Sequence, residues 1–121
     1  ETIVIAWNCS TETARTVALA MPFLEQAKQV IILSVEGYGV PGPSGAELRQ
    51  NLVRNGIAAQ VNIIPKSKST TARSILEETT SIGGDLLIKG AYTQSRLRQM
   101  IFGGVTNEIL ATADIPVLMS H

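Results

Sequence analysis

Short apolar runs of strand length alternate with helix-like segments five times along the chain, and this alternation restricts the fold more than any other feature. Strands separated by single helices imply βαβ units, right-handed crossovers and a parallel sheet. The sequence therefore predicts one doubly wound α/β domain over residues 1–121, with helices on both faces of the sheet. The five expected strands are Ile3–Trp7, Val30–Val35, Ala58–Ile64, Leu86–Ile88 and Ile115–Met119.

The first expected helix follows the first strand directly. Ser10 or Thr11 can cap its N-terminus. Pro22 lies inside the pattern and predicts a kink, because proline has no N–H to donate to the preceding turn. The side chains expected on its buried face are Ala14, Val17, Ala18, Met21, Leu24 and Ala27. Ser44 and Glu47 have the spacing of a capping box at the start of the next helix, and Ser69 or Thr70 can cap the third.

Composition excludes several classes of protein. The chain has 121 residues, of which 45% are hydrophobic and 17% charged, as in one globular domain. Its formal net charge of zero argues against a dedicated nucleic-acid or anionic-membrane binder. No apolar run approaches the ~20 residues of a membrane span, so we expect no membrane association and a cytoplasmic protein. The single cysteine, Cys9, excludes an internal disulfide and a thiolate zinc cluster.

A glycine-marked segment, Asp85–Leu110, carries the strongest functional signal. Its strand ends at Gly90, and Gly103 and Gly104 begin a segment with helical apolar spacing. A glycine pair at a helix start lets an anion approach the free backbone N–H groups, where the helix dipole also favours negative charge. The donors between these glycines are Thr93, Ser95, Arg96 and Arg98. The segment therefore predicts a phosphate-binding loop.

The spacing of this loop resembles the signature of the universal stress protein family. Gly90, Thr93, Gly103 and Gly104 follow the family's pattern of Gly, two residues, Gly, nine residues, Gly and Ser or Thr. Thr93 stands where the family has its second glycine, and Gly104 where it has the hydroxyl residue. The resemblance extends over the whole chain. Nucleotide-binding members usually carry Asp at the position of Asn8 and Gly at that of Cys9, so the resemblance implies an altered site.

The family resemblance implies a fold and a ligand. The fold is an adenine nucleotide alpha-hydrolase-like sheet of five parallel strands in the order 3-2-1-4-5, and the ligand is ATP or AMP bound beyond the carboxyl ends of the strands. The base packs on Val35, the phosphates rest on Gly90 and Gly103–Val105, and Asn8 takes the acidic position. Because Thr93 adds a Cβ where backbone approaches phosphate, binding should be weak or conditional. The full set of expected nucleotide-binding residues is Ala6, Asn8, Ser10, Val35, Lys89, Gly90, Tyr92, Thr93, Ser95, Arg96, Gly103, Gly104, Val105 and Thr106.

Two other glycine-loop and aromatic signals favour structural roles. The run Gly37–Gly42 matches the dinucleotide pattern G-x-G-x-x-G, but Pro41 stands where a helix should begin, so we interpret the run as a loop. Trp7 ends a strand beside the crevice, and a single aromatic there is more often a core residue. Neither signal changes the prediction of an adenine-nucleotide site.

The sequence does not look like that of an enzyme. The sole histidine, His121, is the last residue, and Glu36 is the one carboxylate expected near the crevice. A slow ATPase is therefore a distant alternative to ligand binding. The main alternative is a nucleotide-independent module that acts in the stress response through protein contacts. Its expected interface is the edge strand Ile115–Met119, which would pair in a homodimer or with a tandem sister domain.

Overall fold

A computed structural model describes residues 1–91 and 104–121. Its five strands form a single parallel sheet in the order β3-β2-β1-β4-β5, as the sequence predicted. The strands are β1 (Thr2–Ala6), β2 (Gln29–Val35), β3 (Ala59–Ile64), β4 (Leu86–Gly90) and β5 (Val117–Ser120). The described helices are α1 (Thr11–Leu19), α2 (Met21–Gln26), α3 (Gly45–Arg54), α4 (Thr71–Ser81) and α6 (Val105–Thr112).

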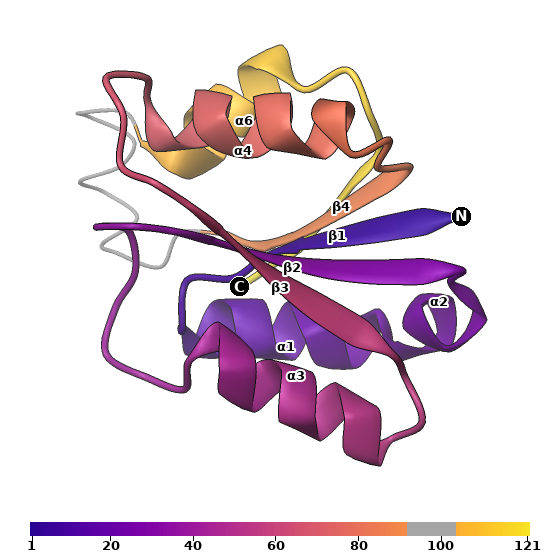
Figure 1. The fold of residues 1–121 in the computed structure, drawn as a ribbon. Coiled ribbons are helices and arrows are strands. Elements are labelled where there is room, and N and C mark those ends of the chain that lie inside the picture. Colours follow the sequence, from indigo (N-terminus) through magenta and orange to yellow (C-terminus); the bar gives the residue numbers. More distant parts are fainter. Residues whose placement is uncertain (92–103) are drawn as a thin grey trace.

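The helices cover the two faces of the sheet (Figure 1). Helices α1, α2 and α3 lie on one face, over a core that includes Ile3, Ile5 and Ile32. Helices α4 and α6 lie on the other, over a core that includes Val4 and Leu87. Successive residues of β1 alternate between these two cores, because side chains in a strand point to opposite faces. Both faces of the central strands are therefore buried, which explains their continuous apolar runs.

Side-chain caps begin the first three long helices. The hydroxyl oxygens of Ser10, Ser44 and Thr70 each accept a hydrogen bond from the backbone N–H three residues later. These residues were among the predicted caps, and their function follows from the free N–H groups of a first helical turn. The caps also fix where the chain turns from strand to helix at the carboxyl edge of the sheet.

Pro22 divides the first predicted helix rather than kinking it. Helix α1 ends at Leu19, and α2 begins at Met21 with the proline in its first turn. A proline is tolerated in a first turn because its missing N–H has no partner there in any helix. The prediction of one kinked helix was therefore wrong, and the buried face was predicted incorrectly in part: Ala14 and Ala18 are exposed.

The last strand is shorter than predicted. It begins at Val117, two residues after the predicted start, although Leu87 N–H still donates to the carbonyl of Pro116. Pro116 has no N–H for the ladder, so regular pairing starts after it. The end of the strand moves to Ser120, opposite Gly90.

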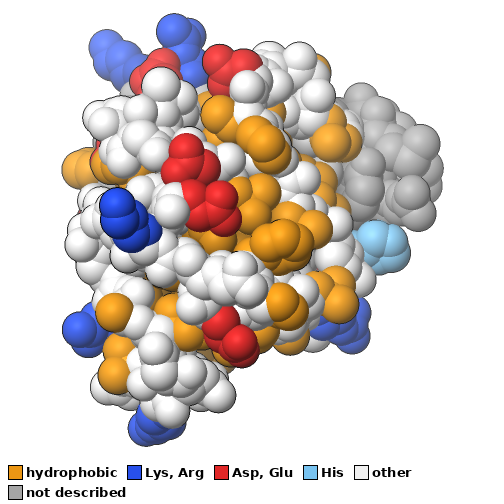
Figure 2. Space-filling view, turned by 90° about the vertical axis from the view of Figure 1, so that its right-hand side faces the viewer, with side chains coloured by type: hydrophobic (Ala, Val, Ile, Leu, Met, Phe, Trp, Pro, Cys, Tyr) orange, Lys and Arg blue, Asp and Glu red, His pale blue; other side chains and the backbone are white. Residues whose placement is uncertain are grey.

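The surface carries some exposed apolar side chains, including Leu19 and Phe23. Figure 2 looks onto the end of the sheet where the strands begin, and hydrophobic side chains gather in the middle of this view with acidic ones among them. Apolar atoms contribute more than half of the accessible surface of a typical folded protein, so exposed apolar side chains are expected. Within the described ranges, no helix has the length and apolar character needed to cross a membrane.

Candidate functional site

The order of the strands reverses between β1 and β4, and their carboxyl ends define the candidate crevice. The chain leaves β1 toward β2 on one side, while β4 lies on the other side of β1. Ala6 and Lys89 are partners in the last register pair of β1 and β4, so these two predicted site residues lie side by side. Ligand sites of open parallel sheets lie at such a reversal.

Asn8 organises the turn between β1 and α1. Its side chain is 2% exposed, and Oδ1 accepts hydrogen bonds from Ser10 N–H (3.2 Å), Ser10 Oγ (2.6 Å) and Thr13 Oγ1 (2.7 Å). Its Nδ2 donates to the hydroxyl of Tyr38 at 3.3 Å. The predicted residues Asn8 and Ser10 are thus brought together, with the amide oxygen tied to the first turn of α1.

Cys9 adopts the left-handed backbone conformation, with a φ of 66°. This conformation costs a residue with a Cβ on the order of 1 kcal/mol, which gives a physical reason for glycine at this position in a tight turn. The loop after β2 packs closely against the same turn. A Cβ on Gly42 would lie 2.0 Å from the carbonyl oxygen of Cys9, and Val40 N–H donates to the carbonyl of Asn8 at 3.0 Å.

Gly90 contacts the first turn of α1. A Cβ at this position would lie 2.5 Å from the backbone nitrogen of Thr13 and 2.6 Å from its Oγ1. Only glycine allows α1 and the end of β4 to approach so closely. Gly90 and Asn8 therefore adjoin the same residue, Thr13, which sequence reasoning did not select. The hydroxyl three residues after the Ser10 cap was the available signal.

Lys89 is a buried cation at the end of β4. Its side chain is 2% exposed, and Nζ donates to the carbonyl oxygen of Gly90 at 2.7 Å. Burial lowers the pKa of the Lys89 ammonium to about 8, because a low-dielectric environment disfavours the charged form. A buried lysine is rare in soluble proteins unless it has a charged partner.

The N-terminus of α6 lies at the same end of the sheet as the end of β4 (Figure 1). Gly104 is its N-cap, has extended backbone and makes no side-chain cap. Val105 is half-buried, and Thr106 is 2% exposed. The backbone N–H groups of a first turn are donors for an anion. The predicted residues Tyr92, Thr93, Ser95, Arg96 and Gly103, together with Arg98, lie outside the described residues.

Tyr38 contacts both the turn after β1 and the end of β2. It was not predicted as a site residue. Its N–H donates to the carbonyl of Val35 at 3.1 Å, and its ring packs against the core under α4 and α6. Burial raises the pKa of the Tyr38 phenol, and the hydrogen bond with Asn8 opposes this effect in part. The predicted residue Val35, 9% exposed, belongs to the same core. An aromatic residue between two loop glycines was the signal that sequence reasoning left unused.

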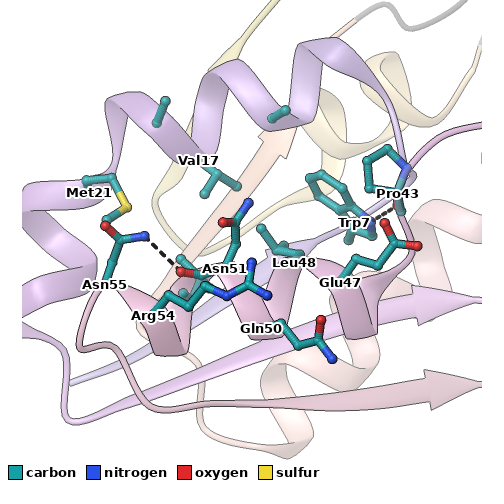
Figure 3. Close-up of a pocket in the computed structure, with 13 residues that line it drawn as sticks. Trp7, Val17, Met21, Pro43, Glu47, Leu48, Gln50, Asn51, Arg54 and Asn55 are labelled. Carbon is teal, nitrogen blue, oxygen red and sulfur yellow. Dashed lines mark hydrogen bonds between the residues drawn. The ribbon is translucent and has the colours of Figure 1, made fainter.

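A separate groove lies on the opposite face of the sheet, between α1 and α3 (Figure 3). Its volume is about 480 Å³, and its floor includes Trp7, Val17 and Leu48. Asn51 of α3 and Asn55, which caps the C-terminus of α3, stand along one wall, and Trp7 Nε1 donates to the carbonyl of Pro43 at 2.9 Å. Trp7 is 4% exposed and belongs to the core under α1 and α3, which confirms its interpretation as a core residue.

The described residues contain no group of three or more His, Cys, Asp and Glu side chains placed to hold a metal ion. Glu36 accepts a hydrogen bond from the N–H of Lys66 at 3.3 Å and forms part of the loop structure.

The comparisons with known proteins agree on one family. The model of the universal stress protein family matches residues 1–121. The stress response protein NhaX of Bacillus subtilis (strain 168) is 34% identical over 74 residues, which are 61% of this chain and 43% of NhaX. The chain thus aligns with less than half of that relative's length.

Solved structures share the fold at low sequence identity. A universal stress protein from Archaeoglobus fulgidus DSM 4304 superposes with a TM-score of 0.76 at 18% identity, over 98% of this chain and 43% of that one. A universal stress protein in complex with cAMP gives 0.74 at 17% identity, over 100% and 96% of the two chains. An Archaeoglobus fulgidus relative in complex with dAMP gives 0.68 at 12% identity, over 99% and 96%.

Proposed function

The chain belongs to the universal stress protein family, and on that premise we propose that it is a ligand-binding module for an adenine nucleotide. The nucleotide lies in the crevice between the carboxyl ends of β1 and β4. Its base packs near Val35, and its phosphate faces Gly90 and the first turn of α6, where Gly104, Val105 and Thr106 lie. The module binds without turnover and acts in the stress response through protein contacts.

The observation that carries this proposal is the convergence of buried polar groups on one crevice. Asn8, Lys89 and Thr106 are each 2% exposed, and all lie where β1 or β4 ends or where α6 begins. Buried polar side chains are costly unless they have partners, and ligand sites use a few precisely placed polar groups to fix a ligand. Two solved relatives in complex with cAMP and dAMP support an adenine nucleotide as the ligand class.

We propose that binding is weak. By the family resemblance, Thr93 stands at the position of a glycine and Gly104 at that of a hydroxyl residue in nucleotide-binding members. A Cβ near the phosphate restricts the approach of the backbone, and the missing hydroxyl removes one donor. Thr93→Gly combined with Gly104→Ser should therefore bind ATP more tightly than the wild type when both are measured by calorimetry.

Thermal unfolding with AMP, ADP, ATP, cAMP and no nucleotide tests the proposal. A ligand at about 100 times its Kd adds about 2.7 kcal/mol of stability, which corresponds to about 10 °C for a domain of this size. Guanosine monophosphate is the matched control for the base. No shift with any adenine nucleotide at millimolar concentration would refute the binding function.

A second function, assembly through β5, has an observation of its own. All four residues of this outermost strand are half-buried, and Val117, Leu118 and Met119 are apolar. An apolar edge strand with free backbone groups favours pairing with another edge. We propose that β5 pairs in a homodimer, or with a sister domain in a longer chain, whether or not a nucleotide is bound.

A further inference from the structure

Lys89 lies inside the protein on the face of the sheet covered by α4 and α6. Its neighbours in β4, Leu87 and Ile88, belong to the cores under α4 and α6 and under α1 and α3, respectively. Because alternate residues of a strand share a face, Lys89 shares the face of Leu87. Its register partners are Ala6 in β1 and Met119 in β5, neither of which carries a charge.

The ammonium group of Lys89 has little compensation for its burial. Its hydrogen bond to the carbonyl of Gly90 engages one of three N–H donors. Among residues 1–91 and 104–121, Lys89 takes part in no ion pair. A buried charge without a counter-charge is strongly unfavourable, and burial lowers the pKa of Lys89 to about 8 accordingly.

Several ionisable groups on neighbouring elements have other partners. On α6, the carboxylate of Glu108 accepts from Thr70 Oγ1 at 2.7 Å. On α4, Arg73 pairs with Glu77 at 2.7 Å, and both side chains are mostly exposed. In the loop after β2, the Tyr38 hydroxyl is bonded to Asn8. The described part of the chain thus provides Lys89 with no anionic partner.

We propose that Lys89 provides the counter-charge for a phosphate monoester, so that the crevice prefers a nucleoside monophosphate with a free terminal phosphate over a cyclic phosphodiester. This inference rests on the proposed nucleotide function. A phosphomonoester carries close to two negative charges at neutral pH and three terminal oxygens, whereas a cyclic diester carries one charge and two such oxygens. The two remaining N–H donors of Lys89 and the first turn of α6 match the monoester better.

Binding of such an anion changes the protonation of Lys89. A nearby negative charge raises the pKa of an ammonium group, so the bound lysine holds its proton at pH values where the free one has lost it. Above about pH 8, binding therefore takes up a proton, and the affinity for the monoester decreases as the pH rises further. AMP itself contributes no proton there, because the second phosphate pKa is about 6.

Calorimetry with the full chain tests this assignment. The variants are Lys89→Met, which keeps a flexible unbranched side chain of slightly shorter length and removes the charge, and Lys28→Met as the matched control at an exposed lysine. We expect Lys89→Met to weaken AMP binding roughly tenfold or more and 3′,5′-cyclic AMP binding by less than about threefold, because a charge-assisted hydrogen bond exceeds a neutral one. Lys28→Met should bind both like the wild type.

A second measurement uses the wild type alone, so its result does not depend on whether the variant folds. AMP titrations at about pH 8.5 in two buffers of different ionisation enthalpy give the number of protons taken up. Proton uptake on AMP binding supports the role of Lys89. Equal AMP affinity in wild type and Lys89→Met, or no proton uptake, would overturn it and leave nucleotide binding intact. Absence of binding by AMP and cyclic AMP to the wild type would overturn the proposed function and this inference together.

Discussion

Replacing Asn8 by alanine should destabilise the domain far more than the loss of one hydrogen bond. In the folded protein, Oδ1 accepts from Ser10 N–H, Ser10 Oγ and Thr13 Oγ1 at 2.6 to 3.2 Å, and all three residues are buried. Alanine removes the acceptor and leaves the donors inside the protein. A buried donor without a partner costs about 1–3 kcal/mol.

The size of this destabilisation depends on whether the donors can form hydrogen bonds with one another in the variant. Ser10 Oγ and Thr13 Oγ1 are 3.0 Å apart, so one hydroxyl can donate to the other in the variant. The backbone N–H of Ser10 and the remaining hydroxyl proton lose their shared acceptor. Two such losses at the middle of the range give a destabilisation of about 4 kcal/mol.

Urea unfolding followed by the fluorescence of Trp7, the sole tryptophan, measures this change. Asn62→Ala is the matched control, because the half-buried Asn62 amide accepts one bond from Gln60 at the surface, and we expect a change within about 0.5 kcal/mol. Asn8→Asp keeps an oxygen in place and should retain most of the stability. A loss below about 1 kcal/mol in Asn8→Ala, with an unchanged m-value, would show that Asn8 does not hold this turn together.

Three further predictions concern the loop, the buried lysine and the edge strand. Gly42→Ala should cost about 2 kcal/mol or more in urea unfolding, because its Cβ would lie 2.0 Å from the Cys9 carbonyl oxygen; Gly56→Ala, where that space is open, should cost about 1 kcal/mol through its φ of 79° alone. The folded pKa of Lys89, about 8, lies below its ordinary value of 10.5, so the folded chain releases its proton first and the unfolding free energy should rise between these pH values. Lys89→Met should remove that rise, and an unchanged pH profile would contradict the burial of the charge. Val117→Asp should convert a homodimer to a monomer in sedimentation experiments; a monomeric wild type at high micromolar concentration would eliminate the β5 interface.

Most of the fold could be predicted because it depends on local pattern. The apolar runs Val30–Val35 and Leu86–Ile88 are typical of buried parallel strands, and their alternation with helices predicts a parallel sheet, while the strand order was implied by the family resemblance. Pro22 shows the limit of that reasoning. A proline inside a periodic pattern is consistent with either a kink or a new helix, and tertiary packing decides between them.

The candidate site was harder to predict, because its geometry depends on contacts between distant segments. The resemblance to a known family selected Asn8 and Gly90. Nothing in the sequence indicates that both residues contact Thr13 in the folded protein. Tyr38 lies 30 positions from its partner Asn8. Loop residues that fold back onto another turn have no periodic pattern, so sequence reasoning treated this stretch as a connection only.

Asn8 and Lys89 both affect the charge of the crevice. The family resemblance implies an Asp at the position of Asn8; Asn8 is uncharged, and its amide oxygen accepts the three hydrogen bonds that hold the turn. This substitution removes a negative charge from the crevice without removing the acceptor. Lys89 adds a buried positive charge next to Gly90. An uncharged Asn8 and a buried Lys89 both favour an anion in a region of low dielectric constant, where salt screens charges weakly. We therefore expect increasing ionic strength to weaken nucleotide binding less than it would at an exposed basic patch.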